Sequence, residues 1–226
     1  MWKFIKKLWE KGLSGKTTII CSIVVLLGAT AGTIYGIVTS AGDEGLLEGG
    51  GHKLKWKRTD FPICCTYDHD GDYERSVYIS QSYERARQEI NERVGAQLLG
   101  ACHAWSVSKP MPEHVFGAIT LRVGAPSINI DGAGSVTTGS PFDAHPGGST
   151  DIHWDKRDGH IISAAIYIQP NLKEKYTDRV WLHEVLHALG LAHDRLRSSV
   201  MYTSLSDRPS RLSIKDVELL QKVYVE

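Results

Sequence analysis

The segment HEVLHALGLAHD, which begins at His183, constrains the fold of this chain more than any other. His183 and His187 are four residues apart, so on a helix they lie one turn apart on the same face and can share a metal ion. Gly190 is a typical residue for ending a helix, and the turn that it permits can bring His193 back as a third ligand. The segment therefore predicts a helix, a sharp turn and a bound metal.

Three imidazoles leave one position of a tetrahedral zinc ion open, which is typical of a catalytic rather than a structural site. Glu184 lies one residue further around the helix, where its carboxylate can reach a metal-bound water without ligating the metal, so we expect it to be the general base. The alternative is that these histidines merely form a polar helix face. Five specified residues at these spacings match by chance at roughly one in ten million positions, which favours the metal site.

These residues match the signature H-E-x-x-H-x-x-G-x-x-H, and the chain resembles the metzincin zinc metallopeptidases. Met201, in SVMYTS, lies where the resemblance implies the methionine turn, and Met201-Tyr202 is similar to the matrixins. Residues 55–63 and 212–224 also resemble parts of a matrixin catalytic domain. The resemblance implies a Zn²⁺-dependent endopeptidase whose protein or peptide substrate lies along an edge strand, for which Ile161–Ile168 is the candidate.

Hydrophobic patterning predicts an α/β (α+β) domain with a mixed sheet, an active-site helix and a C-terminal helix, which is the fold that the resemblance implies for residues 53–226. Strands are expected at 61–68, 114–124 and 161–169, and helices at 82–102, 179–190 and 212–224. Ser82 and Ser213 are the expected N-caps of the first and last helices. Residues 124–160 are rich in Gly, Pro, Ser, Asp and His, so we expect them to be mostly loop.

A long apolar segment precedes this domain. Residues 17–42 contain no charged residue and are long enough for a helix to cross the hydrocarbon layer. Lysines dominate the charges before it and acidic residues follow it, which predicts a cytoplasmic N-terminus and an extracytoplasmic domain. We therefore expect a basic tail at 1–16, a transmembrane signal anchor at 17–40 and a linker at 41–52. The alternative is a cleaved signal peptide, whose apolar region is usually roughly 7–15 residues.

The anchor also suggests partners. Gly28, Gly32 and Gly36 repeat at a spacing that lets two helices approach closely, as in a homodimer, although glycine is also simply common in membrane helices. Membrane lipid is the other expected partner of the N-terminal helix. The formal net charge of +0 argues against a nucleic-acid partner, since phosphate binding needs an excess of Lys and Arg.

Residues 143–160 resemble the matrixin loop that holds a structural zinc ion and calcium. His145 and His153 match its histidines, and Asp155 falls where an acidic calcium ligand is expected. The usual upstream His-x-Asp pair is missing from the sequence. Two interpretations remain, a second metal site with Zn²⁺ or Ca²⁺ and a solvated loop.

Four cysteines are too few for a disulfide scaffold, and Cys21 lies in the apolar segment. We expect Cys102 to pair with Cys64 or Cys65, which leaves one thiol over. Three unpaired cysteines are the alternative, because spacing alone cannot establish that two Cα atoms approach closely enough.

Three functions are compatible with the sequence. The favoured one is a membrane-anchored zinc endopeptidase that acts on extracytoplasmic proteins. The alternatives are a non-catalytic, membrane-anchored zinc-binding interaction module and a zinc hydrolase that acts on a non-protein amide. Glu184 favours an enzyme, because a structural zinc site does not need a general base.

Overall fold

The computed structural model of this protein describes residues 45–67, 73–105, 110–112, 114–123, 134–138, 147–170, 172–205 and 207–226. The predicted basic tail and signal anchor, with Gly28, Gly32 and Gly36, lie outside these residues, and so does His145. Within the described ranges no helix is both long and apolar enough to cross a membrane. The structure thus bears on the predicted catalytic domain and on the end of the linker before it.

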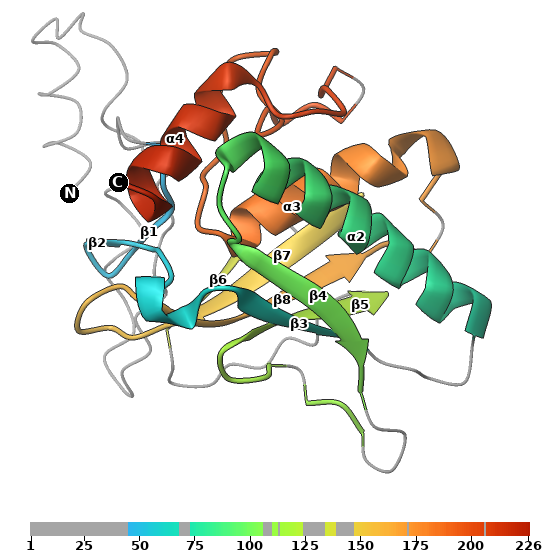
Figure 1. Ribbon diagram of the computed structural model, residues 1–226, viewed down its shortest axis with the longest axis horizontal. Helices are drawn as coiled ribbons and strands as arrows, with labels where there is room; N and C mark the ends of the chain where they lie inside the picture. Colours follow the sequence, from blue (N-terminus) through green and yellow to red (C-terminus); the bar gives the residue numbers. More distant parts are fainter. Residues whose placement is uncertain are drawn as a thin grey trace, which may run out of the picture. The chain divides into compact units, whose positions relative to one another are not determined.

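A mixed sheet forms the centre of the domain, as the sequence predicts (Figure 1). Its strands in spatial order are β4 (Leu99–Ala104), β3 (Ile63–Tyr67), β5 (Ala118–Val123), β8 (Ile161–Ile168), β7 (Gly148–Trp154) and β6 (Gly134–Thr138). The first four strands are parallel to one another, whereas β7 runs antiparallel to β8 and β6 antiparallel to β7. The predicted strands correspond to β3, β5 and β8, so the mixed α/β class is confirmed.

Helices α2 (Tyr73–Val94), α3 (Thr177–Ala188) and α4 (Ile214–Tyr224) pack beside this sheet, with short 3₁₀ turns at Arg58–Asp60 and Glu174–Tyr176. α3 packs against β7, β8 and α2, and α4 packs against α2 (Figure 1). The predicted cap of the last helix is confirmed, because the Asp216 N–H donates to the Ser213 hydroxyl at 3.2 Å. α3 is therefore held between the sheet and α2.

The helix predicted over 82–102 has different bounds. α2 begins well before Ser82, which is 1% exposed inside the helix, so the predicted N-cap is wrong. The helix ends before Gly95, which adopts a φ of 75°. The side chain of Asn91 then accepts the Leu99 N–H at 3.1 Å and donates to the Leu99 carbonyl at 2.8 Å. These bonds tie the last turns of α2 to Leu99, the first residue of β4.

Residues 124–160 include two strands that the sequence did not predict, β6 and β7. The polar composition of this region concealed a strand, β7, whose residues Thr150, Ile152 and Trp154 are buried. The same pairing places β8 between β5 and β7, so the prediction that Ile161–Ile168 forms an edge strand is wrong. In the sheet that the structure describes, the edges are β4 and β6.

The segment before Lys53 folds onto the domain. Leu46 and Leu47 are 5% and 3% exposed. The short strands β1 (Glu48–Gly49) and β2 (His52–Lys53) pair in antiparallel fashion. Part of the predicted linker, residues 41–52, is therefore packed against the domain rather than free of it.

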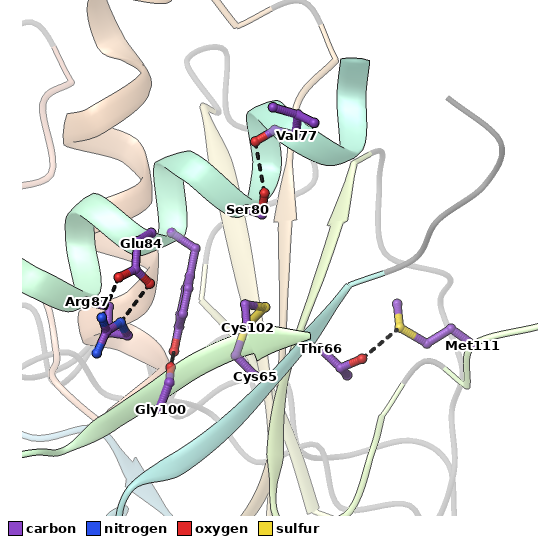
Figure 2. Close-up of a disulfide and its surroundings, with 10 residues drawn as sticks. Cys65, Thr66, Val77, Ser80, Glu84, Arg87, Gly100, Cys102 and Met111 are labelled. Carbon is purple, nitrogen blue, oxygen red and sulfur yellow. Dashed lines mark hydrogen bonds and ion pairs between the residues drawn. A yellow bond between two sulfur atoms is a disulfide. The ribbon is translucent and has the colours of Figure 1, made fainter. Parts of the chain in front are cut away.

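A disulfide joins Cys65 of β3 to Cys102 of β4, where the two residues face each other across the ladder (Figure 2). Cys64, one residue earlier, is exposed and carries a free thiol. One of the two expected pairings is thus confirmed, and the alternative of three unpaired cysteines is wrong. The Tyr83 hydroxyl of α2 donates to the Gly100 carbonyl of β4 at 3.1 Å, which fixes α2 on β4.

Candidate metal centre

Helix α3 carries His183 and His187, which are 2% and 1% exposed. The chain reverses just after the helix, at Gly190, where φ is 88°. A side chain does not fit here, because a Cβ atom on Gly190 would lie 2.2 Å from the carbonyl oxygen of Leu54. This reversal brings His193 back to the two helical histidines.

The three histidines turn their Nε2 atoms toward one point. The Nε2 atom of His193 lies 3.1 Å from that of His187 and 3.3 Å from that of His183. The Nδ1 atoms of His183 and His187 lie 2.8 Å from the Val200 carbonyl and 2.7 Å from the Leu191 carbonyl. A carbonyl can only accept a hydrogen bond, so each Nδ1 carries the proton and each Nε2 presents a lone pair.

This donor set fits a zinc ion. A tetrahedral zinc ion with Zn–N bonds of about 2.0–2.1 Å separates its nitrogen ligands by about 3.3 Å, close to the separations observed. Burial, followed by the charges of the neighbouring histidines, lowers the pKa of His183 and of His187 well below the ordinary value. Both rings are therefore neutral, which is the form that binds a metal. The three side chains together could hold one divalent ion.

Glu184 is 4% exposed on the same helix. The Thr150 hydroxyl of β7 lies 2.8 Å from the Oε2 atom and 3.0 Å from the backbone carbonyl of Glu184, so the sheet positions this carboxyl group. Burial raises the pKa of Glu184 to about 7 in the metal-free protein, against the lowering effects of the Thr150 hydrogen bond and the positive charge of Arg208. A carboxyl group that exchanges its proton near neutral pH is suited to general acid–base chemistry.

The turn that contains Met201 is tied to α4 by a buried carboxylate. Asp216, 3% exposed, accepts hydrogen bonds from the Ser199 hydroxyl at 2.6 Å and from the Val200 N–H at 3.1 Å. The Val200 carbonyl in turn accepts from His183, and Met201 itself is 2% exposed. The C-terminal helix therefore fixes both the Met201 turn and the orientation of one predicted ligand.

The C-terminal end of α3 is capped from distant parts of the chain. Its last carbonyls have no partner within the helix, as at any helix end. Their donors are Trp56 Nε1 to Ala188 O (2.8 Å), the Tyr224 hydroxyl to Leu189 O, and the Leu47 N–H to Gly190 O (2.8 Å). The Ala192 N–H also donates to the Gly45 carbonyl at 2.9 Å. The turn that carries His193 is thus held by the N-terminal segment and by α4.

The second metal site at His145, His153 and Asp155 stays a prediction. His145 lies outside the described residues. The Asp155 carboxylate accepts hydrogen bonds from the guanidinium and the backbone N–H of Arg157, and these bonds hold the pKa of Asp155 well below its ordinary value. The third predicted residue, His153, lies in a different cluster, together with His114 and Asp151.

Sequence reasoning missed three residues around the centre. Thr150 has no local signal, because its partner Glu184 is 34 positions away. Arg208, 7% exposed, donates to the Tyr202 carbonyl at 2.9 Å and could be recognised only once the fold was known. Asp216 did have a signal, since its spacing from Ser213 is that of a capping box, but the spacing does not reveal the bonds to the Met201 turn.

The matrixin family model matches residues 122–225 of the chain. The matched segment contains the three histidines, Glu184 and Met201, together with the whole of α4. No curated protein matches the chain.

Proposed function

Since this chain carries a matrixin-like metallopeptidase domain over residues 122–225, we propose that it is a zinc-dependent endopeptidase. The proposed metal ligands are His183, His187 and His193, and the proposed general base is Glu184. The observation that carries the proposal is the convergence of three histidine Nε2 atoms beside a buried carboxyl group whose pKa is raised to about 7.

Each residue around the centre has its own role in the proposed hydrolysis. When bound, a zinc ion supplies a Lewis acid that polarises the scissile carbonyl and acidifies water. Glu184 accepts a proton from the attacking water and delivers it to the leaving nitrogen. Thr150 keeps the Glu184 carboxyl group in place, while the Val200 and Leu191 carbonyls keep the rings of His183 and His187 turned inward.

The proposal includes a location outside the cytoplasmic membrane, with extracytoplasmic proteins as substrates. The apolar segment at 17–40 and its lysine-rich N-terminal flank support it. The disulfide between Cys65 and Cys102 supports it independently, because disulfides persist in oxidising compartments. Protease added to intact cells should digest the domain after residue 45, and complete protection of that domain would contradict the location. Contact with lipid and a homodimer through Gly28, Gly32 and Gly36 remain predictions.

The decisive experiment compares Glu184→Ala with the wild type as full-length, purified chains. We expect the variant to retain zinc and to lose cleavage of unfolded proteins by about 10²–10⁴-fold, the usual contribution of a general base. Glu92→Ala is the matched control, because Glu92 is an exposed residue of α2 and its loss should change neither property.

Absence of chelator-sensitive cleavage by the wild type, tested on a broad panel of unfolded proteins, would overturn the proposed activity. A chain that binds zinc under these conditions without cleaving would fit the non-catalytic zinc-binding module instead. Release of a non-protein amide product would identify the other alternative, an amidase.

A further inference from the structure

A second cluster of potential metal ligands lies away from the histidines of α3. The Nε2 atom of His114 is 3.1 Å from the Oδ2 atom of Asp151, and the Nε2 atom of His153 is 3.9 Å from the same oxygen. The two imidazole rings stack with their centroids 3.6 Å apart. One ligand atom from each of the three residues lies within 4.8 Å of the others.

The register of the sheet explains why these side chains meet. Asp151 and His153 are two residues apart on β7, so they project from the same face of the sheet. His153 pairs directly with Ser163 of β8, which places Ser163 on that face as well. The segment that carries His114 is attached to β8 through a 2.8 Å hydrogen bond from the Gly117 N–H to the Ile162 carbonyl.

This face is opposite the one that serves Glu184. Successive residues of a strand alternate between its faces, so Thr150 contacts Glu184 of α3 while Asp151 points the other way. The cluster is therefore separate from the proposed active site. The cluster also extends beyond the segment that matches the matrixins, because His114 lies before residue 122.

The polar contacts suit a cation. The Nδ1 atom of His114 lies 3.1 Å from the Ser163 hydroxyl, and when Nδ1 donates this bond, the Nε2 atom faces Asp151 with a lone pair. A divalent ion would accept a lone pair from each imidazole and offset the charge of the Asp151 carboxylate.

We propose that His114, Asp151 and His153 form a second metal site, which binds a divalent transition ion such as Zn²⁺. Two imidazoles and one carboxylate suit zinc, whereas Ca²⁺ and Mg²⁺ prefer sets of oxygen ligands. The side chains of the three residues are 12%, 12% and 28% exposed, so water can complete the coordination. The bound ion joins the segment before β5 to β7 and stabilises the face of the sheet opposite α3.

The test counts zinc ions on purified full-length chains after dialysis in a zinc buffer. The wild type should bind two ions per chain, one for each cluster. The variant His187→Ala/His193→Ala should keep one ion, and His114→Ala/His153→Ala should also keep one. The variant with all four substitutions should bind none. Chains with only the second cluster disrupted should still cleave unfolded protein in a chelator-sensitive manner.

Two conservative variants distinguish the loss of a ligand from misfolding of the chain. Asp151→Asn keeps the shape of the side chain but removes its charge, and it should abolish the second ion while circular dichroism stays unchanged. Ser163→Ala tests positioning of the His114 ring, and it should weaken zinc binding at this site by about 10–100-fold. The proposal is overturned if the chain lacking His187 and His193 binds no zinc, or if neither conservative variant changes the affinity. A wild type that binds a single ion, lost with His187 and His193, would refute the second site and leave the proposed endopeptidase intact.

Discussion

Tyr224→Phe tests whether the end of α3 depends on a donor from α4. Tyr224 is 3% exposed, and its hydroxyl donates to the Leu189 carbonyl just after the helix. Burial raises the pKa of this phenol above its ordinary value, so the donor keeps its proton throughout the working pH range. Phenylalanine has the same shape but no hydroxyl, so the substitution leaves a buried carbonyl without this partner. An unsatisfied buried acceptor costs about 1–3 kcal/mol.

Urea unfolding of the metal-free full-length chain measures this cost. We expect a lower midpoint at an unchanged slope, together with a melting temperature lower by about 2–4 °C for each kcal/mol. Glu92→Ala is the control, because Glu92 is exposed on α2, so the change should stay within about 0.5 kcal/mol. If Tyr224→Phe is as mild as the control, the Leu189 carbonyl does not need this donor and the proposed capping of α3 is incorrect.

Three further substitutions test other parts of the domain. Gly190→Ala should lower the free energy of unfolding, measured in urea, by more than about 3 kcal/mol. The positive φ costs about 1–2 kcal/mol, and the clash of the new Cβ with the Leu54 oxygen, only 2.2 Å away, adds to this cost. A near-neutral result would contradict the observed turn. Because the metal-free fold raises the pKa of Glu184 from 4.5 to about 7, it binds this proton more tightly than the unfolded chain does, and the stabilisation present below pH 4.5 is lost as the pH rises through 7. Glu184→Gln should therefore gain stability over the metal-free wild type as the pH rises from 5 to 8, by up to about 3 kcal/mol, and a pH-independent difference would argue against the raised pKa. Replacing both Cys65 and Cys102 by Ser should lower the unfolding free energy by about 3–4 kcal/mol, the value for a loop of this length, whereas an unchanged midpoint would show that the bridge does not form.

The predictions that succeeded rest on short-range spacing. The helix with His183 and His187, the reversal at Gly190 and the return of His193 all lie within one short segment, so local geometry determines how these residues meet. The cap of α4 at Ser213 is local for the same reason.

Several predictions that failed or stayed open depend on pairing between distant segments. Whether Cys64 or Cys65 faces Cys102 depends on the register of β3 with β4, which no local pattern reveals. The polar residues of β7 look like loop residues until their partners are known, among them Glu184 for Thr150. The sequence does not reveal that β7 pairs with β8, so it could not show that Ile161–Ile168 is an internal strand.

The unit that supports the metal centre is larger than the segment that matches the matrixins. A chain cut to residues 122–225 would lose β3, β4, α2 and most of β5, which would expose β8 as an apolar edge. It would also lose the Trp56 and Leu47 donors to the end of α3, at a cost of about 1–3 kcal/mol for each buried carbonyl left unpaired. Domains are stable by only about 5–15 kcal/mol, so these losses are large. Even a chain that begins at Lys53, with every proposed ligand present, lacks the pairing of Gly45 and Leu47 with the turn before His193, and its metal affinity should suffer for that reason.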